Sequence, residues 1–227
     1  MPVSHVIELH FPLPACLSPD LVVQHLQACE PLITPHPYLL RYNRQPVDEK
    51  DVASDPFFTK DGARIECYEV VDRIVIVPFL GLSKDIKIPA TFQLMPAGVR
   101  CRADAQGGVR VWSTYEVRRR DLGAEFERAG RADSDGVARD DLHDIVDGAG
   151  LSSPGAGEWE LVEHARVECN VIVKPFVIRS FESSHRDLCQ KVIDELKRKA
   201  GEEHVAEAQS HAQPVPVVTP QAPQVVA

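Results

Sequence analysis

The chain has 227 residues, of which 44% are hydrophobic and 26% are charged, an ordinary composition for a globular protein. Its net charge of −9 and pI near 5.5 argue against binding nucleic acid or anionic membrane surfaces. No segment reaches the roughly 18 apolar residues of a membrane span, and the first residues lack the features of a signal peptide. We therefore expect a cytoplasmic protein without integral membrane association, whose six scattered cysteines stay reduced.

The first predicted elements are a strand and a helix. Residues Ser4–Leu13 alternate between polar and apolar, as a half-buried strand does. Ser18, Pro19 and Asp20 then form a helix start, with a capping hydroxyl, a proline suited to the first turn and an acid at the positive end of the helix dipole. Apolar residues follow at helical spacing, which predicts an amphipathic helix over Pro19–Ile33.

Strand patterns dominate the middle of the chain. A polar loop at Asp48–Gly62, with Phe57 and Phe58 packed back onto the body, and a tight turn at Val71–Asp72 separate some of them. Alternate residues of the strand at 109–118, from Val109 to Val117, form its inward face. The predicted strands are Leu39–Val47, Ala63–Val70, Arg73–Phe79, Ile86–Met95, Val99–Asp104, Val109–Arg118 and Trp159–Asn170.

Two segments differ in composition from the rest. Arg120–Gly157 is rich in Asp, Gly, Ala and Arg, which predicts a flexible insertion between two strands. Gly201–Ala227 is rich in Pro, Gln, Val and Ala, which predicts a disordered tail. We therefore expect one domain over residues 1–200.

A long amphipathic helix is predicted to close the domain, over Val171–Lys199. Strands grouped in one run between helices indicate an α+β fold, in which a curved antiparallel sheet of about seven strands wraps around this last helix. Such folds often hold an apolar cavity between sheet and helix. The candidate cavity residues on the helix face are Val177, Phe181, Ser184, His185 and Leu188.

Three residues on strands complete the candidate site. Tyr115 belongs to the inward face of its strand, and Glu69 and Arg73 flank the predicted bend beside inward-facing residues. Six glutamates lie on predicted strands, and any that faced an apolar pocket would have a raised pKa and could act as an acid or base. They are Glu66, Glu69, Glu116, Glu160, Glu163 and Glu168.

Several short motifs carry a family resemblance: Tyr68, Asp72-Arg73-Ile74, Pro78, Val167-Glu168-Cys169-Asn170-Val171-Ile172, Phe176-Val177 and His185. They resemble motifs of an uncharacterised fungal domain family. The resemblance covers Pro2–Arg119 and Trp159–Arg198, and it includes neither the insertion nor the tail. That family looks like part of the helix-grip superfamily, with START domains and polyketide cyclases (SRPBCC), which implies a hydrophobic cavity and no particular reaction.

The sequence contains no recognisable catalytic or metal-ligating motif. Ser184 and His185 are adjacent on a helix, so their side chains diverge and do not form a nucleophile–base pair. The nine histidines show no spacing typical of metal ligands. We therefore expect no metal and no cofactor.

Three functions remain open, and each makes a different prediction about the core. A binder of a hydrophobic small molecule, such as a lipid or polyketide-like compound, needs an apolar cavity and is favoured over an enzyme. A cyclase- or isomerase-type enzyme needs a convergent pair in that cavity, such as a carboxylate and a histidine. A protein-interaction module, with partners unspecified, predicts a core filled by large side chains.

Overall fold

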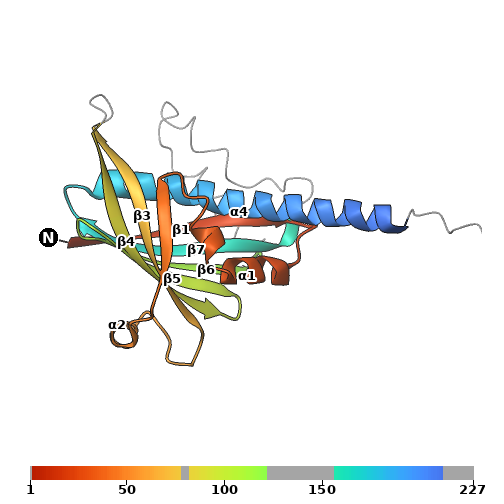
Figure 1. The fold of residues 1–227 in the computed structure, drawn as a ribbon, viewed down its shortest axis with the longest axis horizontal. Helices are drawn as coiled ribbons and strands as arrows, with labels where there is room; N and C mark the ends of the chain where they lie inside the picture. The colour runs from red at the N-terminus through yellow and green to blue at the C-terminus, as the bar shows by residue number, and fades with distance from the viewer. Residues whose placement is uncertain (1, 78–81, 122–155, 212–227) are drawn as a thin grey trace, which may run out of the picture.

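The computed structural model describes residues 2–77, 82–121 and 156–211 (Figure 1). Within these ranges it contains one seven-stranded antiparallel sheet, in the spatial order β1-β7-β6-β5-β4-β3-β2. The first and last strands along the chain, β1 and β7, therefore lie side by side at one end of the sheet. The strands are β1 (Pro2–Pro14), β2 (Leu39–Gln45), β3 (Ile65–Val77), β4 (Leu82–Met95), β5 (Gly98–Ala105), β6 (Val109–Arg119) and β7 (Ala156–Asn170).

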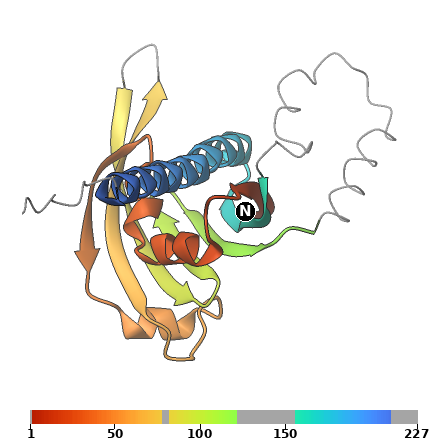
Figure 2. The same ribbon diagram turned by 90° about the vertical axis from the view of Figure 1, so that its right-hand side faces the viewer.

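The predicted α+β fold with a closing helix is confirmed. Helix α4 (Lys174–His211) packs against the sheet, and Figure 2 shows α4 and α1 (Pro19–Gln27) together on the concave side. Leu196 and Val192 of α4 join Val22 and Leu26 of α1 and the inward residues of β1 in one buried core. The part of α4 after Cys189 is packed tightly against the sheet and α1, whereas the part before Cys189 packs less tightly against the sheet.

Two predicted boundaries, one in the sheet and one in the closing helix, differ from the structure. The predicted turn at Val71–Asp72 is wrong, because β3 continues through it and pairs with β4 as Val71 with Lys87 and Asp72 with Ile86. Neither residue is a glycine or proline, and Val71 is 1% exposed, so burial of the valine favours an unbroken strand. Helix α4 also continues to His211, past the predicted end at Lys199 and into the segment predicted as a tail.

The other helical differences lie before the central strands. The predicted helix Pro19–Ile33 is divided at Cys29, whose φ of 64° cannot belong to an α-helix, and a separate 3-10 turn, η1 (Glu30–Leu32), follows it. The predicted loop Asp48–Gly62 contains a short helix, α2 (Glu49–Ser54), capped by the Asp48 carboxylate. Phe58 is buried, as predicted.

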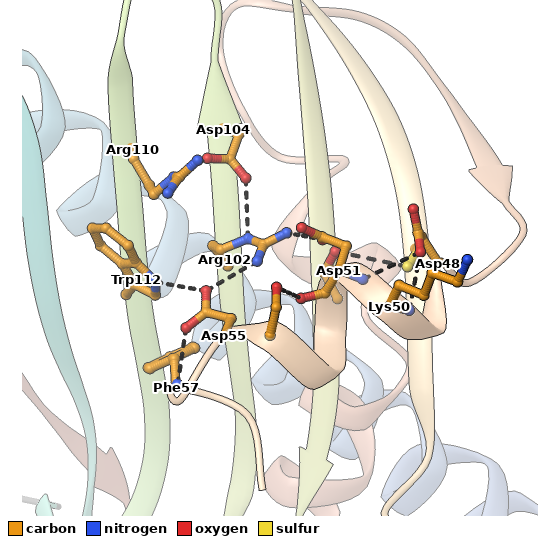
Figure 3. A network of polar contacts seen from close by, with 12 residues as sticks. Asp48, Lys50, Asp51, Asp55, Phe57, Arg102, Asp104, Arg110 and Trp112 are labelled. Carbon is orange, nitrogen blue, oxygen red and sulfur yellow. Dashed lines mark hydrogen bonds and ion pairs between the residues drawn. The ribbon is translucent and has the colours of Figure 1, made fainter. Parts of the chain in front are cut away.

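A cluster of charged residues holds α2 against the convex face of the sheet (Figure 3). Arg102 of β5 is 6% exposed, donates to Asp55 at 2.9 Å and to Asp51, and lies 3.0 Å from an oxygen of Asp104. Trp112 Nε1 also donates to Asp55, at 3.2 Å. Burial raises the pKa of Asp55, but hydrogen bonds from the Phe57 amide, Arg102 and Trp112 outweigh it and leave this pKa below its ordinary value.

Some predictions fall on residues that the structure does not describe. Most of the predicted insertion, residues 122–155, and the last part of the predicted tail, residues 212–227, lie outside the described ranges. Among the helices in the described part of the chain, none has the length and hydropathy needed to cross a membrane.

Candidate functional site

An apolar cavity of about 430 Å³ lies between the sheet and the first half of α4. Its floor is formed by inward-facing residues of β3 to β6, of which Ile88, Cys101, Ala103, Val109 and Val111 are only partly buried. Residues on the same concave face beyond the cavity, such as Val99 and Leu161, are completely buried. The sheet is therefore packed at one end of α4 and open beneath the other. A cavity of this size falls in the range that holds drug-sized molecules.

The segment after α1 closes one side of the cavity. Leu32 and Ile33 contribute apolar surface, and His36 and Tyr38 contribute polar groups beside them. Lys191 of α4 donates to the backbone oxygen of Pro35 at 3.2 Å, which ties this segment to the closing helix. Helix α1 itself is not part of the wall, because its apolar side chains are used in the core.

Six of the eight residues predicted for the site line the cavity: Tyr115, Val177, Phe181, Ser184, His185 and Leu188. The Ser184 hydroxyl donates to the backbone oxygen of Ser180 at 2.8 Å, so its one hydrogen-bond donor is used within the helix. Glu69 and Arg73 do not line the cavity. They lie on the opposite face of β3 and pair with Lys87 at 3.2 Å and Asp85 at 2.8 Å, respectively.

A buried carboxylate organises one end of the cavity. Glu163 of β7 is 0% exposed and accepts a hydrogen bond from the Ser113 hydroxyl at 2.9 Å. The same oxygen lies 2.7 Å from Nδ1 of His185, which stacks on Phe181 with ring centroids 3.7 Å apart. Ser113, Tyr115 and His185 line the cavity and Glu163 lies behind them, so we call these four residues the Glu163 cluster.

The contact with Glu163 determines the chemistry of the His185 ring. The Glu163 oxygen that faces Nδ1 also accepts from the Ser113 hydroxyl, so we assign the proton of this contact to Nδ1. In the neutral ring Nε2 is then an acceptor, and it is the nitrogen left for a molecule in the cavity. A carboxylate that fixes a histidine tautomer in this way also stabilises the protonated ring.

Two further groups around Glu163 remain protonated at neutral pH. Burial raises the pKa of Tyr115 well above its ordinary value, and the nearby Glu163 carboxylate adds to the effect. Burial and Glu163 raise the pKa of the Cys189 thiol in the same way. The Tyr115 hydroxyl, which lies 3.2 Å from His185 Nδ1, is neutral because its pKa is raised, and it forms part of the cavity wall.

The sequence contained a signal for Glu163 that the prediction did not use. In β7 the alternate residues Leu161, Glu163, Ala165 and Val167 share one face, so the only carboxylate in this series had to point into the core. The prediction also missed Ser113 as a site residue, together with His36 and Asp72 at the other side of the cavity. Groups of three or more His, Cys, Asp or Glu suited to a metal ion do not occur among the described residues.

Comparison with known proteins identifies a family and adds no activity. No curated protein matches the chain. The crystal structure of TTHA0849 from Thermus thermophilus is similar over 87% of this chain and 99% of that chain, with 10% sequence identity and a TM-score of 0.45. At that identity and TM-score the similarity supports no argument about this protein. A family described as Domain of unknown function (DUF7053) matches residues 2–198, and the chain therefore belongs to that family.

Proposed function

We propose that the protein binds a hydrophobic small molecule in the cavity between the sheet and α4. The observation that carries this proposal is the combination of an apolar cavity of about 430 Å³ with a polar cluster at one end. Apolar walls supply affinity through burial, and a few fixed polar groups supply orientation. The ligand would place a hydrogen-bonding group at His185 and Tyr115 and its apolar part along Val177, Leu188 and the strands.

The test is native mass spectrometry of the full chain, followed by denaturing extraction of any bound compound. We expect a stoichiometric adduct that is lost on denaturation and extracts as an apolar molecule. A thermal-shift panel of long-chain alcohols, long-chain amines, sterols and aromatic polyketide-like compounds covers a ligand lost in purification. The absence of both an adduct and any thermal shift would overturn the proposal.

A second function, acid–base catalysis in the same cavity, is favoured by the 2.7 Å contact between Glu163 and His185. A carboxylate and a histidine converge there, as the sequence analysis required of an enzyme. In an isomerisation, His185 Nε2 would take a proton from a carbon next to a carbonyl and return it to another carbon, with no net change of atoms. Glu163 would stabilise the protonated ring.

Deuterium exchange separates these two functions. The recovered ligand is incubated with the protein in D₂O and analysed by mass spectrometry for incorporated deuterium. Catalysis predicts incorporation that is lost in His185→Gln while the ligand still binds. A ligand that binds without incorporating deuterium supports binding alone. The third function, an interaction module with a filled core, is not favoured by the cavity.

A further inference from the structure

A second polar pair lies in the cavity wall, away from the Glu163 cluster. Asp72 of β3 and His36 of the segment after η1 both line the cavity. Asp72 is 5% exposed, and one of its oxygens is 3.2 Å from His36 Nδ1. The angle between these groups is unsuitable for a hydrogen bond. His36 Nδ1 therefore has no hydrogen-bond partner among the described residues.

The other carboxylate oxygen of Asp72, Oδ1, is buried and has no hydrogen-bond partner in the described part of the chain. Buried carboxylate oxygens are costly to leave unpaired, because the group has lost water without gaining a donor. The buried carboxylate of Glu163 and the partly buried carboxylate of Asp55 each accept several hydrogen bonds. Asp72 therefore differs from them, because its carboxylate lines an apolar cavity and has an oxygen without a donor in the described part of the chain.

The strand register places this pair far from the Glu163 cluster. Ser113 on β6 is paired with Cys101 on β5. Cys101 is in turn paired with Phe92 on β4, and Phe92 with Glu66 on β3. Asp72 is thus on the third strand from Ser113 and six residues further along β3. Three strand spacings alone correspond to about 14 Å along the sheet. One ligand that touches both polar groups must be elongated.

We propose that Asp72 and His36 form a second anchor in the cavity, which binds a hydrogen-bond donor of the ligand, either a hydroxyl or a protonated amine. This inference rests on the proposed function and specifies its ligand as an elongated apolar molecule with a donor at one end. A hydroxyl and an amine both supply a hydrogen-bond donor to the Asp72 carboxylate, which the structure leaves short of donors. The amine adds charge attraction in a site of low polarity.

The probes for this proposal are dodecan-1-ol, dodecylamine and dodecyl methyl ether, tested by displacement of N-phenyl-1-naphthylamine fluorescence from the full chain. The ether keeps the apolar chain and the oxygen but removes the donor. We expect the alcohol and the amine to bind at least about tenfold more tightly than the ether, because hydrogen bonds to charged groups have that strength. If dodecylamine binds more tightly than dodecan-1-ol, charge pairing with Asp72 contributes to affinity. If these two bind equally and both more tightly than the ether, the site recognises the donor without its charge.

Variants then locate the preference at Asp72. In Asp72→Ala the preference for a donor should disappear, while affinity for the ether should stay within about twofold. Asp85→Ala is the matched control, since this exposed aspartate pairs with Arg73 on the neighbouring strand and does not line the cavity, and it should keep the preference. If Asp72→Ala does not fold, equal affinity of the unmodified protein for the three probes would still overturn the proposal.

The outcomes also separate this inference from the proposed function. Alcohol, amine and ether bound with equal affinity would overturn the second anchor and leave the proposed function standing. Failure of all three probes and of the fluorescent dye to bind would count against both. A donor preference that persists in Asp72→Ala would place the recognition elsewhere and overturn the role of Asp72.

Discussion

The buried carboxylate of Glu163 is the single residue on which the polar end of the cavity depends. Glu163→Ala removes the acceptor for the Ser113 hydroxyl and for His185 Nδ1 and leaves both without it. We expect a loss of about 3 kcal/mol in the free energy of unfolding, the usual cost of removing one member of a buried polar network. Urea denaturation followed by circular dichroism measures it.

A glutamate on the same strand provides the control for that change. Glu168 is 39% exposed at its side chain and approaches Arg166 only at 4.0 Å. Glu168→Ala should change the free energy of unfolding by less than about 0.5 kcal/mol. Equal effects of the two substitutions would show that the Glu163 cluster does not stabilise the fold.

Replacing glycine by alanine should change the free energy of unfolding in opposite directions at Gly98 and Gly201. A Cβ at Gly98 would lie 2.0 Å from the backbone oxygen of Tyr115, so Gly98→Ala must push β5 away from β6. A Cβ at Gly201 in α4 meets nothing within 4 Å. We expect Gly98→Ala to lower the free energy of unfolding by more than about 2 kcal/mol and Gly201→Ala to raise it by about 0.5 kcal/mol. Thermal and urea unfolding test both, and destabilisation by both alike would be inconsistent with these contacts.

For single residues, the sequence predicted which face of a strand or helix a side chain occupies better than which residue it contacts. The period of two along β6 placed Tyr115 on the inward face, and the helical period of α4 placed Val177, Phe181 and Leu188 at the cavity. The contact between His185 and Glu163 joins residues 22 positions apart on different elements. Spacing along the chain gives no information on such a contact, because it arises only when the helix lies over the sheet.

Among the elements, α2 depends most on one distant side chain. Arg102 lies on β5 and forms ion pairs with two aspartates, Asp51 within α2 and Asp55 directly after its last residue. In Arg102→Ala we expect a loss of about 3 kcal/mol in stability and faster amide hydrogen exchange at residues 49–54. Arg110→Ala removes an exposed partner of Asp104 and should cost less than about 1 kcal/mol, with exchange in α2 unchanged. Hydrogen exchange read by mass spectrometry would contradict the prediction if α2 stayed equally protected in both variants.

The attachment of α2 should also weaken in acid. The pKa of Asp55 is lowered in the folded protein from its ordinary value of 3.8, so the ionised form stabilises the folded state. That stability is complete above the unfolded pKa and is lost as the pH falls through the lower, folded pKa. Wild type should therefore exceed Asp55→Asn in stability at pH 6, and the difference should shrink below about pH 4. Urea denaturation at a series of pH values measures this difference, and a constant gap from pH 6 to pH 2 would refute the prediction.

For the whole molecule, the sequence predicted the architecture and could not predict the state of its core. Strands in one run, flanked by helices, gave the α+β sheet with its closing helix, which the structure confirms. The same apolar periodicity on β5, β6 and α4 is compatible with a filled core or with a cavity. The difference depends on side-chain volumes summed across elements, and the small residues Ala90, Ala103 and Ala105 opposite α4 contribute to the open space.

An enlarged side chain tests the cavity directly, without knowledge of the ligand. Ala103 lines the cavity and is partly buried, so Ala103→Leu has room and should change stability by less than about 1 kcal/mol or increase it. Ala165 is 2% exposed within the packed core, and Ala165→Leu should cost about 1–3 kcal/mol through overpacking. Ala103→Leu should also weaken binding of dodecan-1-ol at least about tenfold, because it occupies the space that the ligand needs. Equal destabilisation by the two substitutions would mean that the region beneath α4 is filled in solution, and the binding function would then have no site.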